Sequence, residues 1–137
     1  SRRGLLKSSK NSTLWGGWVI EKSGFKIWFA GDIAFGDGSY YEAIGKRFSP
    51  IDVSFLPIGS YKPSRYTRQH ISPRQAVQLH LMVGSKKSIA MHWGTFGMVY
   101  ERLEDPPMDL NRARLELKVP VSEFFTLFHG EICPLFE

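Results

Sequence analysis

Two short apolar segments of this chain each lead to a side chain that can bind a metal ion. Residues 89–91 are apolar and are followed by His92, with a glycine two positions further on. Residues 27–30 are also apolar and lead through a glycine to Asp32. In open α/β sheets, ligands collect at the carboxyl ends of the strands. Imidazole and carboxylate both suit a borderline cation such as zinc. The pattern predicts two strands that deliver one ligand each, although two ligands do not close a metal site.

Both residues also have ordinary explanations. Asp32 precedes a loop that contains Gly36 and Gly38, where an aspartate commonly caps its own turn. If it instead serves a metal, its carboxylate can bind one ion or bridge two. His92 stands among apolar neighbours, where a histidine is often hydrogen-bonded within the core. The local pattern leaves both explanations open.

The other three histidines lie in different contexts. His70 belongs to a basic loop just before a helix start. It is either a candidate for proton transfer or substrate positioning, or an ordinary surface histidine. His129 follows the last predicted strand, where it either orients a metal ligand through a hydrogen bond or caps the strand end. His80 lies inside a predicted helix, and helical packing explains it.

Size and composition indicate one folded domain. The chain has 137 residues, of which 42% are hydrophobic and 14% aromatic, and this argues against disorder. The net charge of +5 permits attraction to phosphate, anionic lipid or nucleic acid without choosing among them. Cys133 is the only cysteine, so an internal disulfide and a thiolate-rich zinc site are both excluded. A reducing compartment is compatible with this cysteine usage.

No targeting or membrane-spanning segment is recognisable. No apolar run approaches the roughly 20 residues that cross a bilayer, and no signal-peptide pattern opens the chain. The first residue is serine rather than methionine, so we expect the chain to be a piece of a longer polypeptide.

Apolar periodicity and turn residues predict an α/β layered domain over residues 13–137, preceded by a basic arm over residues 1–12. The first two strands form a hairpin, and Ser72-Pro73 is a good helix start. Long loops cover residues 31–38 and 59–71. Strands are predicted over residues 13–20, 25–30, 52–58, 88–92 and 124–128, and helices over residues 40–48, 73–83 and 108–118.

Other common chemistries fit poorly. The Gly36–Gly38 segment lacks the Lys-Ser/Thr pair that a phosphate-cradling loop needs. The chain has no Gly-x-Ser-x-Gly nucleophile motif. Its tryptophans lie in predicted strands rather than along a basic stripe, so nucleic acid is not an expected partner.

Six motifs occur in one order along the chain. They are FAGD (29–32), IGKRFSPIDVSFLPIGSYKP (44–63), HISPRQAVQLH (70–80), KKSIAMHWGTF (86–96), EDPP (104–107) and HGE (129–131). This series resembles the N-acyl-phosphatidylethanolamine phospholipase D family, a branch of the metallo-β-lactamase superfamily. The resemblance extends over nearly the whole chain from about Leu14, and several motifs in order are more specific than any one of them.

The resemblance implies the C-terminal half of an αββα sandwich that carries two zinc ions. Family members hold these ions with an HxHxDH loop, a further histidine, a bridging aspartate and a final histidine. Asp32 matches the bridging aspartate, and His92 matches the final histidine. His70 matches a histidine that is implicated in catalysis or substrate positioning. The HxHxDH loop is absent from this sequence, and the further histidine is expected upstream of Ser1.

The activity that the resemblance implies is hydrolysis of N-acyl-phosphatidylethanolamine to phosphatidic acid and an N-acylethanolamine. It implies a phospholipid substrate, a peripheral membrane surface and an intracellular location in the cytoplasm or at that surface, with a homodimer left open. With only two of the expected ligands, we expect the isolated chain to be catalytically silent. The alternatives are a related hydrolase of another ester or phosphodiester, and a truncated binding module without catalysis.

Overall fold

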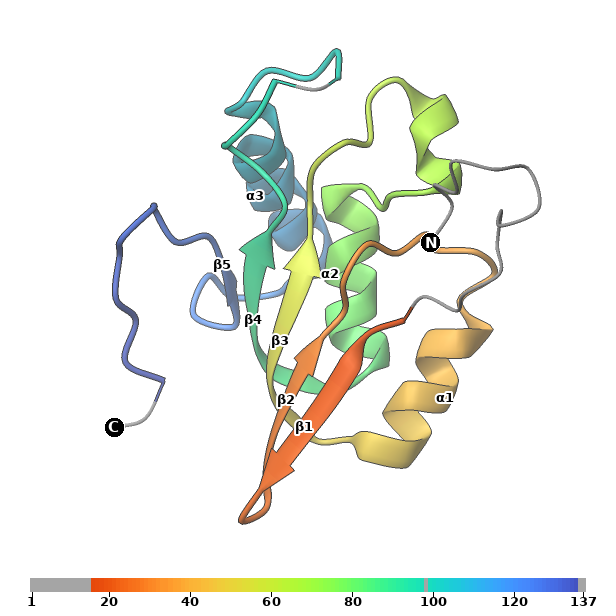
Figure 1. Ribbon diagram of the computed structural model, residues 1–137, viewed down its shortest axis with the longest axis vertical. Coiled ribbons are helices and arrows are strands. Elements are labelled where there is room, and N and C mark those ends of the chain that lie inside the picture. The colour runs from red at the N-terminus through yellow and green to blue at the C-terminus, as the bar shows by residue number, and fades with distance from the viewer. Residues whose placement is uncertain (1–15, 98, 136–137) are drawn as a thin grey trace, which may run out of the picture.

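The computed structural model describes residues 16–97 and 99–135 and contains, within them, a five-stranded sheet in the order β1-β2-β3-β4-β5 (Figure 1). The strands are β1 (Trp18–Lys22), β2 (Phe25–Phe29), β3 (Ile51–Pro57), β4 (Ser85–Met91) and β5 (Phe124–Phe125). Strands β1 and β2 form an antiparallel hairpin, and the pairs β2·β3, β3·β4 and β4·β5 are parallel. The carboxyl ends of β2, β3 and β4 therefore lie along one edge of the sheet.

Helices pack on one face of this sheet. They are α1 (Ser39–Phe48), α2 (Pro73–Met82) and α3 (Asp105–Leu117), with a 3₁₀ turn, η2 (Ser64–Arg68), in the loop before α2. Helix α2 contacts β3 and β4, and α1 and α3 each pack against α2. The Ser72 hydroxyl accepts a bond from the Gln75 N–H while the Gln75 side chain accepts from the Ser72 N–H, which fixes the start of α2.

The two faces of the hairpin have different surroundings. Trp28 is 2% exposed and contacts the ring of Tyr41 in α1. Neighbouring residues of a strand point to opposite faces, so Phe29 points away from α1. Trp18 pairs with Phe29 across the hairpin, and these two residues are 72% and 44% exposed. Together with Ile20, which is 58% exposed, they leave an apolar strip on the face opposite α1.

The order of elements agrees with the sequence-based prediction, but several bounds differ. Strand β4 begins at Ser85, three residues before the predicted Ser88, because Ser85 pairs with Ile51 of β3. Strand β5 is limited to Phe124 and Phe125, so the prediction that it reaches Phe128 is wrong. Helix α3 begins at Asp105 because its two prolines fit the first turn of a helix, where no N–H partner is needed. The predicted arm, residues 1–12, and strand residues 13–15 lie outside the described residues.

His80 is part of the core, as helical packing predicted. Its side chain is 2% exposed, its Nδ1 lies 2.9 Å from the Ser88 hydroxyl, and its Nε2 lies 3.6 Å from a Glu123 carboxylate oxygen. Burial lowers the pKa of His80 below its ordinary value of 6.5, and the opposing effect of Glu123 does not cancel this. His80 is therefore held as a neutral imidazole in the folded protein.

We expect the stability of the chain to fall on acidification because of His80. The unfolded state takes up a proton at this residue near its ordinary pKa of 6.5, whereas the folded state takes it up only at lower pH. The free energy of unfolding should thus decrease between about pH 6.5 and the lower pKa of the folded state. Urea titrations at about pH 7 and pH 5 measure the effect. The decrease should be smaller in His80→Asn, which keeps a hydrogen-bonding group near Ser88, and equal decreases in the two proteins would contradict the explanation.

Among residues 16–97 and 99–135, no helix is long and apolar enough to cross a membrane.

Candidate metal centre

Asp32 and His92 meet at the carboxyl edge of the sheet, as their positions after two strands predicted. Asp32 follows β2 through Gly31, whose φ of 70° turns the chain at the strand end. His92 directly follows β4. Strand β3 separates β2 from β4, yet Asp32 Oδ1 lies 3.5 Å from His92 Nε2. The two side chains therefore meet across the end of β3.

The separation of these two atoms fits a shared cation. Zinc binds histidine nitrogen and carboxylate oxygen at about 2.0–2.2 Å, so two ligand atoms at a tetrahedral angle lie about 3.4 Å apart. The observed 3.5 Å agrees with this value. The side chains of Asp32 and His92 are 71% and 27% exposed, so a cation can reach them. Among the described residues, no group of three or more His, Cys, Asp or Glu side chains could hold a metal ion, so the pair is an incomplete ligand set.

The backbone of His92 is strained. Its φ is 62°, in the left-handed region that non-glycine residues rarely adopt. The neighbouring strand end is tightly packed against it, because a Cβ added at Gly59 would lie 2.1 Å from the His92 carbonyl oxygen. Such strain costs on the order of 1–3 kcal/mol and persists where the surroundings hold it, often at functional sites. Ser60, in the segment after β3, has a similar φ of 66°.

His70 lies beside the pair, although it comes from a different part of the chain. Its ring stacks on the ring of His92, with centroids 5.2 Å apart and an interplanar angle of 30°. Its Nδ1 is buried and has no hydrogen-bond partner among the residues that the structure describes. Burial, followed by the effect of His92, lowers the pKa of His70, while Asp32 and Glu101 act in the opposite direction. A neutral His70 has one ring nitrogen free to accept a proton.

His129 is placed near the centre but contacts a different residue. The ring of His129 is exposed, and its Nε2 lies 3.1 Å from the Thr95 hydroxyl. Thr95 belongs to the loop that follows His92. Thr95 is three residues beyond His92 in the chain, so His129 braces that loop. The prediction that His129 orients a metal ligand stays a prediction.

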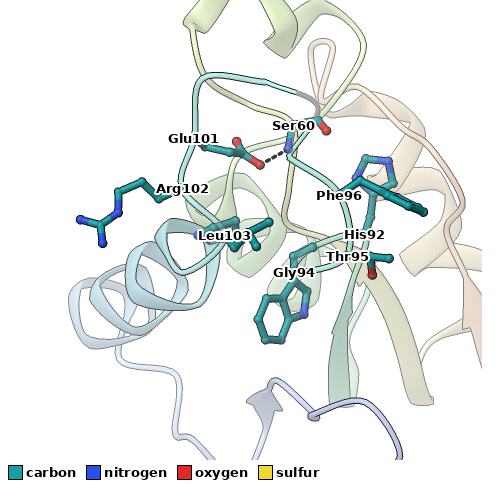
Figure 2. Close-up of a pocket in the computed structure, with 10 residues that line it drawn as sticks. Ser60, His92, Gly94, Thr95, Phe96, Glu101, Arg102 and Leu103 are labelled. Atoms are coloured by element: carbon teal, nitrogen blue, oxygen red, sulfur yellow. Dashed lines mark hydrogen bonds between the residues drawn. The ribbon is translucent and has the colours of Figure 1, made fainter.

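A pocket of about 270 Å³ opens next to His92 (Figure 2). Its walls are formed by the segment after β3, by the loop that connects β4 to α3 and by the first turn of α3. Aromatic and aliphatic side chains supply much of this lining. The lining residues are Ser60, His92, Trp93, Gly94, Thr95, Phe96, Glu101, Arg102, Leu103 and Pro106. The sequence-based prediction missed this pocket because its residues come from three separate segments.

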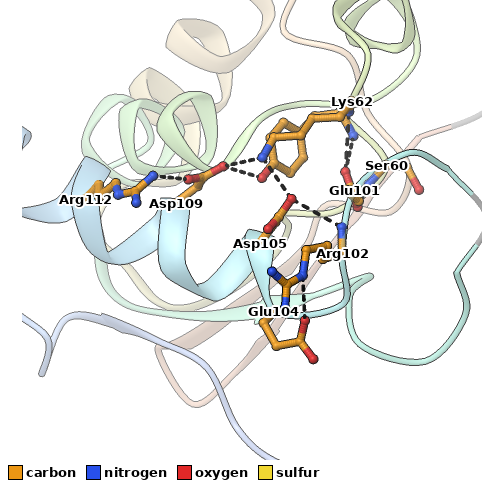
Figure 3. A network of polar contacts seen from close by, with 9 residues as sticks. Ser60, Lys62, Glu101, Arg102, Glu104, Asp105, Asp109 and Arg112 are labelled. Atoms are coloured by element: carbon orange, nitrogen blue, oxygen red, sulfur yellow. Dashed lines mark hydrogen bonds and ion pairs between the residues drawn. The ribbon is translucent and has the colours of Figure 1, made fainter.

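An ion-pair network fixes the loop after β3 to the start of α3 (Figure 3). Lys62 Nζ lies 3.1 Å from a carboxylate oxygen of Asp105 and 3.1 Å from one of Asp109. The Tyr61 hydroxyl donates a hydrogen bond of 2.5 Å to Asp109, which also pairs with Arg112. The Lys62 ammonium lowers the pKa of Asp105, so this carboxyl group stays ionised. The network therefore holds the loop that leads to His70.

Comparison with known proteins agrees with this architecture. Residues 1–93 match the model of the β-lactamase superfamily domain. An N-acyl-phosphatidylethanolamine-hydrolysing phospholipase D of Caenorhabditis elegans is 36% identical over 136 residues, or 96% of this chain. The chain belongs to the metallo-β-lactamase superfamily. A metal-dependent hydrolase of Rubrobacter xylanophilus is also 33% identical over 122 residues, or 85% of the chain. The resemblance found in the sequence is thereby confirmed.

Two solved structures share the fold of this chain. Igni18, a metallo hydrolase of Ignicoccus hospitalis, superposes with a TM-score of 0.56 at 20% identity, covering 81% of this chain and 41% of its own. A variant of the CmlA β-hydroxylase gives a TM-score of 0.58 at 16% identity, covering 82% of this chain and 26% of its own. This chain spans 37% of the length of the Caenorhabditis elegans relative and 46% of that of the Rubrobacter xylanophilus relative.

Proposed function

We propose that this chain is the C-terminal part of a longer protein, a zinc-dependent phospholipase D. The longer protein is referred to below as the full protein. Its reaction is hydrolysis of N-acyl-phosphatidylethanolamine to phosphatidic acid and an N-acylethanolamine. The observation that carries the proposal is the distance of 3.5 Å between Asp32 Oδ1 and His92 Nε2 at the sheet edge. The substrate is suggested by the Caenorhabditis elegans relative, which is 36% identical over 96% of the chain.

In this proposal Asp32 and His92 are two of the metal ligands. A bound divalent cation supplies charge stabilisation for a phosphoryl group and lowers the pKa of water. The carboxylate of Asp32 adds negative charge to the site, and the His92 ring directs its Nε2 toward that carboxylate. The remaining ligands come from residues outside this chain, consistent with the greater length of the relatives. The isolated 137-residue chain is then catalytically silent.

His70 is the proposed proton-transfer or substrate-positioning residue. In the hydrolysis, the oxygen of water joins phosphorus, the bond from phosphorus to the ethanolamine oxygen breaks, and that oxygen takes up a proton. Its place beside His92 and its buried, unpartnered Nδ1 make His70 suited to hold a proton or a phosphoryl oxygen during this change. His129, through Thr95, steadies the loop on the other side of His92.

The surface of the chain supports a larger assembly at a membrane. Trp18, Ile20 and Phe29 form the apolar strip opposite α1, which we propose is covered by the upstream half of the sandwich. The net charge of +5 favours the surface of an anionic membrane, where a phospholipid substrate resides. We therefore propose an intracellular peripheral enzyme, with a homodimer left open and no nucleic-acid partner.

The experiment compares the full protein with the isolated chain. Each is incubated with vesicles that contain N-acyl-phosphatidylethanolamine, and zinc content is measured on the same samples. We expect turnover and bound zinc in the full protein, and neither turnover nor tightly bound zinc in the isolated chain. Turnover with stoichiometric zinc in the isolated chain would overturn the proposal that ligands are missing from it.

The second candidate is a metal-dependent hydrolase of a different ester or phosphodiester. It is supported by the metal-dependent hydrolase of Rubrobacter xylanophilus, which is 33% identical over 85% of this chain. A panel of soluble lactones and phosphodiesters, tested beside the lipid, separates the two. Activity on a soluble compound without activity on the lipid supports the second candidate. The non-catalytic alternative predicts that no HxHxDH motif precedes this segment in the coding sequence.

A further inference from the structure

Glu101 forms several hydrogen bonds with backbone groups close to His92. It lies in the loop between β4 and α3, and its carboxylate accepts bonds from three consecutive N–H groups after β3 (Figures 2 and 3). The donor nitrogens of Ser60, Tyr61 and Lys62 lie 2.5, 3.0 and 3.4 Å from its oxygens. Hydrogen bonds to a charged acceptor are roughly twice as strong as those between neutral groups. Glu101 thus binds the segment after β3 to the segment after β4.

The segment that Glu101 holds is strained and lies directly against His92. Ser60 has a φ of 66°, close to the 62° of His92, so the ends of two adjacent strands both carry a non-glycine residue in the left-handed region. A Cβ added at Gly59 would lie 3.3 Å from Glu101 Oε1 and 2.1 Å from the His92 carbonyl oxygen. The Gly59 backbone therefore packs against both the Glu101 carboxylate and the His92 backbone.

We propose that Glu101 is a positioning residue that sets the His92 imidazole for metal binding through the backbone of Gly59 and Ser60. Each carboxylate oxygen of Glu101 accepts at least one N–H bond from this segment, so the carboxylate is directed at the backbone that packs against His92. The inference rests on the proposed function, because it assumes that His92 serves a metal.

The neighbouring contacts show that Glu101 can be tested alone. Lys62 is tied independently to Asp105 and Asp109, so the loop keeps an anchor when Glu101 is shortened. Glu104 is a matched control, because its carboxylate is 66% exposed and its ion pair with Arg102 spans 3.8 Å. Glu101→Ala removes the acceptor, Glu101→Gln keeps one acceptor oxygen of the same shape, and Glu104→Ala removes a carboxylate from the same loop.

The test measures zinc affinity and amide hydrogen exchange in the full protein. Zinc affinity is determined by competition with a chromophoric chelator, and exchange is followed in the metal-free protein over residues 58–63 and 90–94. We expect Glu101→Ala to accelerate exchange in both segments and to weaken zinc binding by roughly 10- to 100-fold, the usual effect of losing a partner that orients a ligand. Glu101→Gln should give a smaller loss of the same kind, and Glu104→Ala should match the wild type.

Three outcomes overturn the inference. Zinc affinity within about twofold of the wild type in Glu101→Ala and Glu101→Gln would show that Glu101 holds the loop without affecting His92. An equal loss in Glu104→Ala would show a general effect of charge. A wild-type full protein that binds no zinc would overturn the proposed function and the positioning role together, whereas the first two outcomes leave the proposed function intact. If Glu101→Ala does not fold, Glu101→Gln alone decides.

Discussion

In the full protein, Asp32→Asn is expected to abolish zinc-dependent hydrolysis and to lower zinc content. The amide oxygen of asparagine carries no net charge, so it holds a cation far less well than the carboxylate does. Metal ions contribute several kcal/mol to stabilisation of a phosphoryl transition state, and a loss of about 4 kcal/mol corresponds to roughly a thousandfold decrease in rate. The Asp32 side chain is 71% exposed, so the fold should tolerate this substitution.

Asp37→Asn is the matched control for Asp32. Asp37 belongs to the same loop after β2, and its carboxylate accepts hydrogen bonds from the N–H and the hydroxyl of Ser39. An asparagine there retains an acceptor oxygen, so activity and zinc content should remain within about twofold of the wild type. Hydrolysis rate and zinc content are measured on both variants. An Asp32→Asn protein that keeps its zinc and its rate would remove Asp32 from the ligand set.

The second large effect is expected for His70→Gln. A positioned acid or base typically contributes 10²- to 10⁴-fold to a rate, so kcat should fall by about that factor. The zinc content should stay at the wild-type level, because His70 stacks on His92 rather than sharing its pairing with Asp32. Unchanged zinc together with a large fall in kcat distinguishes proton transfer or substrate positioning from metal binding.

Gln69→Ala serves as the control for the loop itself. Gln69 is exposed and directly precedes His70, so it reports damage to the loop without loss of the imidazole. Its kcat should remain close to that of the wild type. Equal losses in Gln69→Ala and His70→Gln would assign the effect to the loop, and loss of zinc in His70→Gln would make His70 a ligand.

Local patterns in the sequence were sufficient to predict the strands that position Asp32 and His92. Apolar runs that end at Asp32 and His92 placed these residues at strand ends, and parallel pairing then brought the ends to one edge. The start of α2 was also predictable, because Ser72 and the proline after it are strong helix-start signals. These features depend on neighbours in sequence, which is why sequence reasoning reached them.

The remaining features of the site depend on contacts between distant segments. The stacking of His70 on His92 joins two residues that are separated in the chain by α2 and β4. Glu101 hydrogen-bonds to backbone groups about 40 residues earlier, and no local pattern separates it from the exposed Glu104. The left-handed φ of His92 likewise occurs where its carbonyl oxygen packs against Gly59, which belongs to a distant segment. Periodicity and propensity carry no information about such contacts.

The most direct test of the metal centre is anomalous X-ray scattering at the zinc edge on crystals of the full protein. We predict a zinc peak about 2.0–2.2 Å from both Asp32 Oδ1 and His92 Nε2, with further ligands from outside this chain. A peak bonded to only one of these two residues, or zinc bound elsewhere while both side chains remain free, would contradict the account.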